Sequence, residues 1–261
     1  MADIVAKRSG SILEIQLNRP SKKNAMTSSM YTTMAEVLEA AAKDDRIRVA
    51  LWHGAGDSFS AGNDLEDFIK NPPGPGESPQ ARLMSALIDF EKPIVAAVQG
   101  VAIGGGTTML GHCDFVYAGE STRFQLPFVN LALVPEFGSS YLFPSRFGYV
   151  RAAELILLGQ PFNASRAAEL GLVTQVVPDQ QLLPTANETA RKLAEKPAAA
   201  LQACKRLMKQ AAREHLERAV NLENAEFADR VRSAEATEAF TAFIEKRKPD
   251  FTRTHAPVTA K

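Results

Sequence analysis

Strand and helix patterns alternate through the first half of the chain, and this alternation limits the fold more than any other feature. Short apolar runs predict buried strands at 49–53, 94–98 and 114–118. Alternating apolar and polar residues over 12–17 predict a half-buried strand, and apolar residues at helical spacing over 27–43 predict an amphipathic helix. Since strands separated by helices form βαβ units with right-handed crossovers, we expect an α/β protein with a mainly parallel sheet.

From residue 151 onward the pattern is almost purely helical, and only 173–177 interrupts it as a predicted strand. Ser165 is the expected N-cap of one of these helices, because its hydroxyl can accept from early helix N–H groups. The predicted helices cover 151–158, 165–170, 182–195, 197–213 and 215–246. We therefore divide the chain into a core over 1–200 and a helical C-terminal region over 201–261, acting as a lid or an oligomerisation arm.

A proline- and glycine-rich segment over 71–79 predicts a surface loop, which is either a cover for a site or a linker.

The composition excludes several classes of function. Thirty basic residues balance thirty acidic ones among 261, so no basic field exists to bind nucleic acid. No apolar run approaches the roughly 18 residues of a membrane span. There is no secretory signal at the N-terminus and no Ser-Lys-Leu-type address over 258–261, so we expect a cytoplasmic protein. Cys113 and Cys204 lie far apart and predict no disulfide. We expect no metal centre, because the histidines lack metal-ligand spacing: His53, His112, His215 and His255.

Residues 127–140 place one carboxylate, Glu136, in an otherwise apolar run directly after Pro135. A carboxylate among apolar neighbours is costly to ionise, so its pKa is predicted to rise toward neutrality. Such a group is suited to take a proton from carbon and to give one back. The alternative is a solvated loop glutamate.

Two glycine-rich turns follow predicted strands, at 59–65 and 100–109. Small residues let the backbone approach a ligand closely. The three glycines at 104–106 expose N–H groups at a strand-to-helix junction, with the helix dipole behind them. Neither a Gly-Lys-Ser/Thr sequence nor Gly-x-Gly-x-x-Gly spacing is present, so we reject a phosphate or dinucleotide loop. Donors of this kind can hold an oxyanion, and with a desolvated carboxylate they form a minimal set for enolate chemistry. Alternatively, the three glycines only allow the backbone to pack closely at this turn.

Taken together, these segments resemble the enoyl-CoA hydratase/isomerase (crotonase) superfamily over nearly the whole chain. The matching segments are 17–26, 60–65, 92–100, 104–106, 152–159, 167–173 and 242–248. The resemblance implies a crotonase-like ββα superhelix with a helical C-terminal trimerisation region, assembled as a homotrimer or a dimer of trimers. It also implies an acyl-CoA thioester substrate and no metal or redox cofactor, since coenzyme A belongs to the substrate.

The resemblance also assigns site residues. It implies that Glu136 is catalytic and that the oxyanion donors are the backbone N–H groups of Asn63 and Gly105. It places the following residues along the substrate and coenzyme A: Lys23, Ala25, Ser60, Ala61, Gly62, Asp64, Leu65, Gly104, Phe128, Phe243 and Lys246. Asp64 is also the expected cap of a helix starting at Leu65, and Phe243 alternatively belongs to a helix core. Candidates for the coenzyme A phosphates, each otherwise a surface charge, are Lys22, Lys23, Lys246 and Lys248.

One departure from the family pattern bears on the reaction. Hydratases of this family carry two glutamates at the positions of Thr108 and Phe128, and neither residue can act as a carboxylate base. The single Glu136 instead resembles the Δ3,Δ2-enoyl-CoA isomerase branch. We expect an isomerase that moves the double bond of a 3-enoyl-CoA to trans-2-enoyl-CoA in fatty-acid β-oxidation. The alternatives are a hydratase or another acyl-CoA reaction on the same fold, and a non-catalytic acyl-CoA-binding homologue.

Overall fold

The main sheet of the protein has six strands in the order β1-β2-β3-β4-β6-β9. The computed structural model describes residues 2–71 and 78–253. β1 is antiparallel to β2, and each following neighbour pair is parallel, which confirms the mainly parallel sheet. The strands are β1 (Ile4–Ser9), β2 (Ile12–Leu17), β3 (Val49–Gly54), β4 (Ile94–Val98), β6 (Phe115–Gly119) and β9 (Gln175–Val177).

A second, three-stranded sheet has the order β5-β7-β8 and carries the chain from the main sheet toward the glycine-rich segment. β5 pairs in parallel with β7, and β7 pairs antiparallel with β8. Its strands are β5 (Val101–Ile103), β7 (Arg123–Gln125) and β8 (Phe162–Asn163). β5 ends directly before Gly104, so this small sheet fixes where the glycines lie.

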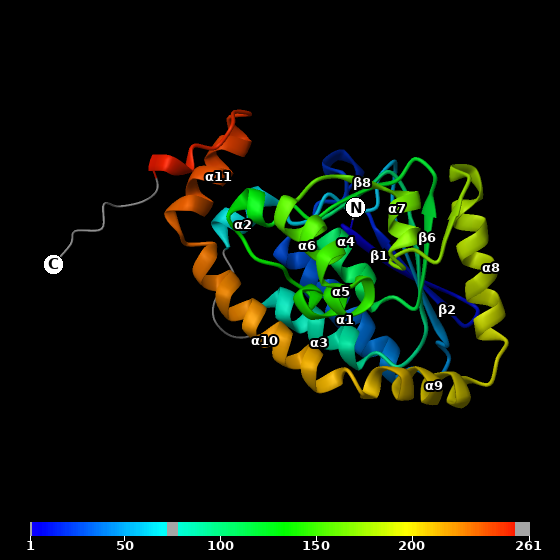
Figure 1. Cartoon of the computed structure of the whole chain (residues 1–261). Coiled ribbons are helices and arrows are strands. Elements are labelled where there is room, and N and C mark those ends of the chain that lie inside the picture. The colour runs from blue at the N-terminus through cyan, green and yellow to red at the C-terminus, as the bar shows by residue number, and fades with distance from the viewer. Residues whose placement is uncertain (1, 72–77, 254–261) are drawn as a thin grey trace.

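Helices cover both faces of the main sheet. Successive side chains of a strand point to opposite faces, and on β3 Ala50 and Trp52 join the larger core with helices α1 and α3. Val49 and Leu51 pack in a smaller core with residues of α8. Figure 1 shows α8 on the opposite side of the sheet from α1 and α3. The helices are α1 (Ser28–Lys43), α2 (Leu65–Lys70), α3 (Pro79–Asp89), α4 (Gly105–Thr108), α5 (Ser139–Phe147), α6 (Tyr149–Leu158), α7 (Ala164–Glu169), α8 (Leu182–Ala194), α9 (Ala198–Gln210), α10 (Arg213–Arg230) and α11 (Ala234–Ile244).

The C-terminal helices return to the body of the molecule. After α9, the long helix α10 packs against α3 and α5, and α11 then lies near α2 (Figure 1). Phe68 of α2 makes edge-to-face ring contacts with Phe227 of α10 at 5.6 Å and with Phe240 of α11 at 6.2 Å. These contacts tie the C-terminal region to the start of α2, next to the 59–65 turn.

The predicted strands at 12–17 and 94–98 coincide with β2 and β4, and the predicted helix over 27–43 is α1 with Thr27 as its N-cap. The prediction of Ser165 as an N-cap is wrong. The side chain of Asn163 accepts the N–H of Arg166 at 2.8 Å, so α7 begins at Ala164.

The single helix predicted over 215–246 is also wrong, because Ser233 caps a new helix by accepting the N–H of Ala236 at 3.1 Å. The division predicted between residues 200 and 201 falls inside α9. Of the loop predicted over 71–79, residues 72–77 lie outside the described residues and Pro79 already belongs to α3.

Within the described ranges, no helix combines the length and the apolar character that a membrane span requires.

Candidate active site

A cavity of about 750 Å³ lies between α2, the β5–α4 junction, the 127–136 segment and the C-terminal helices. It brings together most of the residues predicted for the site: Ala25, Ala61, Gly62, Asn63, Asp64, Leu65, Gly104, Gly105, Phe128, Glu136, Phe243 and Lys246. Segments that are more than a hundred residues apart in the sequence thus share one cavity.

Two of the predicted contact residues do not line it. Lys23 is exposed and lies outside the lining, whereas its neighbour Lys22 lines the cavity. Ser60 is fully buried, and its hydroxyl donates to the Asn24 carbonyl at 2.9 Å and accepts the N–H of Gly62 at 3.1 Å. The role of Ser60 in the structure is therefore to shape the turn. Lys248, a candidate for the phosphates, is likewise absent from the lining.

The backbone N–H of Asn63 is directed away from its neighbouring strand. The N–H of Met26 donates to the Gly62 carbonyl at 2.7 Å, and the N–H of Asp64 donates to the Met26 carbonyl at 2.9 Å. In such a parallel bridge the bonds go to the residues on either side of Asn63, so the N–H of Asn63 itself points to the opposite side.

Gly105 supplies the second N–H group. It is the first residue of α4, where N–H groups have no acceptor within the helix. The prediction of a helix dipole behind this turn needs correction, because α4 is a single turn that continues as a 3₁₀ helix over Met109–His112. The N–H of Asn63 thus points away from Met26, the N–H of Gly105 has no acceptor within α4, and both residues line the cavity.

A side chain at position 105 would crowd the carboxylate of Glu136. A Cβ there would lie 2.9 Å from Glu136 Oε1, 3.0 Å from the Tyr31 hydroxyl and 3.2 Å from Met26 Cε. The absence of a side chain lets the carboxylate of Glu136 lie beside the donor.

Glu136 is 3% exposed, and its Oε1 has no hydrogen-bond donor among the described residues. Burial raises the pKa of Glu136 to about 8, a side-chain hydrogen bond from Asn63 opposes the rise, and the charge of Glu223 adds to it. The predicted rise of this pKa toward neutrality is thus confirmed.

The Asn63 amide is itself oriented by a residue that sequence reasoning missed. The Tyr31 hydroxyl donates to Asn63 Oδ1 at 2.6 Å, which leaves the amide NH₂ as the donor to Glu136. Burial, followed by the charge of Glu136, raises the pKa of Tyr31 well above its usual value, so the phenol stays protonated. The available signal was a hydroxyl-bearing ring on the apolar face of α1, between Met30 and Met34.

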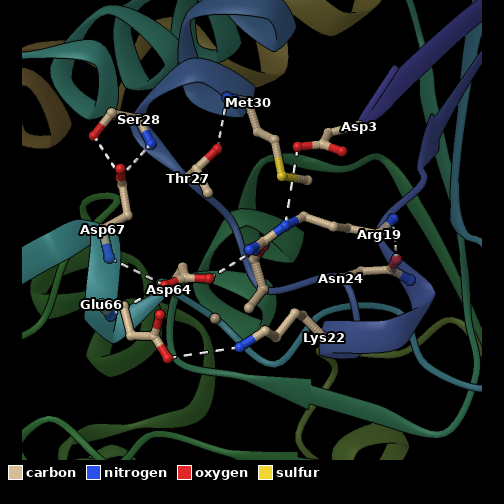
Figure 2. A network of polar contacts seen from close by, with 12 residues as sticks. Asp3, Arg19, Lys22, Asn24, Thr27, Ser28, Met30, Asp64, Glu66 and Asp67 are labelled. Atoms are coloured by element: carbon tan, nitrogen blue, oxygen red, sulfur yellow. Dashed lines mark hydrogen bonds and ion pairs between the residues drawn. The ribbon is translucent and has the colours of Figure 1, made fainter. Parts of the chain in front are cut away.

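The mouth of the cavity is held by the polar network of Figure 2. The Arg19 guanidinium contacts Asp64 at 2.7 Å, and Asp64 Oδ1 caps α2 by accepting the N–H groups of Glu66 and Asp67 at 3.0 and 3.1 Å. Asp67 in turn accepts the N–H and hydroxyl of Ser28 at 2.7 and 2.8 Å. Burial opposes ionisation of Asp64, yet the N–H bonds and Arg19 hold its pKa below its usual range. The predicted capping role of Asp64 is confirmed.

Cationic side chains also stand at the mouth. Lys22, Lys246 and Arg247 line the cavity, and Lys22 contacts Glu66 at 3.6 Å (Figure 2). Arg247 is also paired with Glu238 and with Glu245.

Aromatic and aliphatic side chains line the interior. Phe128 is 4% exposed, and Phe68 and Phe227, which sequence reasoning missed, complete the wall. Phe243 stands at the rim with 63% of its surface exposed, so the alternative of a helix-core role is wrong. Apolar walls exclude water and strengthen the electrostatic effect of the few donors that remain.

Within residues 2–71 and 78–253, no group of three or more His, Cys, Asp or Glu is arranged to hold a metal ion. Cys113 and Cys204 are both free thiols.

Comparison with known proteins identifies relatives that match nearly the full length of this chain. A 1,2-epoxyphenylacetyl-CoA isomerase of Escherichia coli is 37% identical over 92% of this chain and 95% of its own length. Enoyl-CoA delta isomerase 2 of Homo sapiens is 36% identical over 94% of this chain and 64% of its own length. Relatives named enoyl-CoA hydratase match as well.

Among solved structures, an enoyl-CoA hydratase/isomerase from Pseudoalteromonas atlantica superposes with a TM-score of 0.91 at 39% identity, covering 96% of this chain and all of that one. The family model described as Enoyl-CoA hydratase/isomerase matches residues 7–254. The fold described above is thus that of the solved enoyl-CoA hydratase/isomerase, and the chain belongs to the enoyl-CoA hydratase/isomerase family.

Proposed function

We propose that this protein is a Δ3,Δ2-enoyl-CoA isomerase, in which Glu136 carries a proton from C2 to C4 of a 3-enoyl-CoA. The family acts on acyl-CoA thioesters. The observation that carries the proposal is one buried carboxylate with a raised pKa and an unpartnered oxygen, beside the N–H groups of Asn63 and Gly105. The human relative named enoyl-CoA delta isomerase supports the same reaction.

Glu136 is the carboxylate of the cavity that remains available for chemistry. The other acidic residues of the described lining are Asp64, which caps α2 and contacts Arg19, and Glu66, which contacts Lys22. Both are engaged at the mouth.

The positions that hold glutamates in hydratases offer no base for water. Thr108 is fully buried, and its hydroxyl donates to the Gly104 carbonyl at 3.3 Å. Phe128 covers the cavity with a ring that can neither orient nor deprotonate a water molecule. This environment favours proton transfer within the substrate over addition of water.

The proposed mechanism conserves all atoms of the substrate. The thioester oxygen accepts from the Asn63 and Gly105 N–H groups while ionised Glu136 removes a C2 proton. The electrons of that C–H bond enter a dienolate spread over the carbonyl oxygen, C2 and C4. Protonated Glu136 then delivers the proton to C4, so the C3–C4 double bond is lost, a new one forms between C2 and C3, and the thioester carbonyl is restored. Each oxyanion donor is expected to contribute about 3 kcal/mol to lowering the barrier.

We further propose that the reaction requires no metal or redox cofactor and serves fatty-acid β-oxidation, and that the protein assembles as a homotrimer or a dimer of trimers. Exposed apolar side chains on α6 and α9 support assembly: Tyr149, Val150, Leu207 and Met208.

The experiment that tests the function compares turnover of trans-3-hexenoyl-CoA and crotonyl-CoA, with solvent deuterium incorporation followed on both esters. Isomerisation with little hydration supports the proposal. Strong hydration of crotonyl-CoA identifies a hydratase instead, and binding of both esters without deuterium exchange at C2 identifies a non-catalytic acyl-CoA-binding protein.

The pH dependence of kcat/KM is expected to follow the ionisation of Glu136 in the free enzyme. Because only the carboxylate accepts a proton, and its pKa is about 8, kcat/KM should rise about tenfold per pH unit below pH 8 and level off above it. Steady-state rates between about pH 6 and pH 9 give this profile. A profile that is flat over this range contradicts the assignment of Glu136 as the base.

Replacing Tyr31 with phenylalanine is expected to lower kcat about tenfold, the equivalent of losing one buried hydrogen bond. The variant keeps the fully buried ring but leaves Asn63 Oδ1 without its donor, so the amide no longer has a fixed orientation toward Glu136. Rates of trans-3-hexenoyl-CoA isomerisation by both proteins test this. Unchanged kcat would show that the amide is oriented without Tyr31.

A further inference from the structure

One face of α10 packs against the turn that follows the catalytic glutamate. Leu216, Val220 and Glu223 lie on this face at helical spacing. A Cβ at Gly138 would lie 2.3 Å from Leu216 Cδ1 and 3.3 Å from Val220 Cγ2, so α10 reaches the turn backbone itself.

The turn has a conformation that needs external support. Phe137 and Gly138 have φ angles of 59° and 69°, and the N–H of Ser139 donates to the Glu136 carbonyl at 3.2 Å. Two successive residues with positive φ are costly when one of them carries a large side chain. Nε2 of the buried His112 lies 2.7 Å from the Phe137 carbonyl oxygen and holds one side of the turn.

Glu223 holds the other side of the turn. Its Oε2 accepts the N–H of Gly138 at 2.7 Å, and its Oε1 accepts the N–H of Ser140 at 2.7 Å. Gly138 is the N-cap of α5 and has no side chain to satisfy these groups. A carboxylate from a helix 83 to 85 residues away therefore takes the place of a capping residue.

We propose that Glu223 is a positioning residue for Glu136: its carboxylate fixes the turn that carries the catalytic carboxyl group, and its negative charge acts on that group. This proposal rests on the proposed role of Glu136 as the base. It gives the C-terminal region a part in building the active site.

The electrostatic part of the proposal follows from burial of both acids. Glu223 is 5% exposed; burial raises its pKa, while the hydroxyl and N–H of Ser140 and the N–H of Gly138 favour the ionised form. The titratable groups adjoining the turn, Tyr31 of α1 and His112, are neutral, since burial raises the pKa of Tyr31 and lowers that of His112 to about 3. No Lys or Arg of the described chain shifts the pKa of either glutamate. When ionised, Glu223 therefore adds to the rise in the pKa of Glu136 that burial causes, against the hydrogen bond from Asn63.

The test is the Glu223→Gln variant, with Glu226→Gln as the matched control. Glu226 lies on the same helix, but it is exposed and contacts Arg230 at 3.4 Å. In E223Q the amide NH₂ group faces a backbone N–H donor, and the negative charge is gone. We expect kcat to fall at least tenfold with KM changed less than about twofold. The pH below which kcat/KM declines should also be lower in E223Q than in the wild type. E226Q should match the wild type in kcat, in KM and in this pH profile.

Glu223→Asp separates the two contributions. It keeps the charge and shortens the side chain. We therefore expect kcat to fall, while kcat/KM declines at nearly the same pH as in the wild type. It also carries the test if E223Q does not fold. The proposal would be overturned if E223D had the wild-type kcat and if kcat/KM of E223Q declined at the same pH as that of the wild type. A residue with a merely structural role would change stability alone.

A second measurement does not depend on the reaction. The carboxyl ¹³C shift of Glu136, assigned with Glu136→Gln, reports the pKa of this group directly in wild-type protein and in E223Q. A lower pKa in E223Q supports the proposal even if the wild-type protein fails to isomerise 3-enoyl-CoA. If the pKa of Glu136 is the same in both proteins, the electrostatic part of the proposal is wrong, even if isomerisation is confirmed.

Discussion

Replacing Glu136 with glutamine is expected to lower kcat for isomerisation by about 10³- to 10⁴-fold, while KM for the CoA ester changes less than about threefold. The amide fills the same buried volume and still leaves the Asn63 and Gly105 N–H groups free to bind the thioester oxygen. It cannot accept the C2 proton, so the loss falls on the chemical step. Initial rates with trans-3-hexenoyl-CoA and C2 deuterium exchange measure this loss.

Glu66→Gln is the matched control, because Glu66 lines the same cavity at its mouth with 68% of its side chain exposed. It should retain the wild-type kcat. Near-normal turnover by E136Q would show that another group moves the proton and would remove the basis of the proposed function.

The parts of the fold set by local patterns were predictable from the sequence. The alternation of apolar and polar residues over 12–17 and the apolar run over 94–98 specify β2 and β4 directly, because each strand has a distinct buried pattern. Strand β1 was missed because only Ile4 is buried along it. A strand with one buried residue shows no periodicity in its sequence. Its extended conformation is instead stabilised by pairing with β2.

The burial of the proposed catalytic carboxylate was predictable from its local sequence. The residues that orient it, Tyr31 and Glu223, were not predictable. The apolar run over 127–140 predicted that Glu136 is buried, and its side chain is 3% exposed. Tyr31 and Glu223 act on Glu136 from 105 positions before it and 87 after it in the numbering. Within their helices they occupy ordinary positions on a packed face, so only the tertiary fold shows their contacts with the site.

The same carboxylate is expected to make the folded state less stable as the pH rises. In the unfolded chain Glu136 ionises at its ordinary pKa of 4.5, whereas in the folded protein it ionises at about 8. Below pH 4.5 both states are protonated and no penalty exists. Between these values the unfolded chain releases a proton that the folded protein retains, so each pH unit costs the folded state about 1.4 kcal/mol, roughly 5 kcal/mol in all.

Glu136→Gln removes this titration and should therefore stabilise the protein increasingly from about pH 5 to about pH 8, with no further gain above that value. Denaturant unfolding of both proteins across this range gives the difference in unfolding free energy. Titration of groups that do not interact with Glu136, such as His112, is common to both proteins and cancels in the difference. A difference that does not change with pH would mean that Glu136 ionises normally in the folded protein, and a base poised near neutrality would then have to be sought elsewhere. A difference that grows with pH would show that the fold pays in stability for a carboxylate kept ready to accept a proton from carbon.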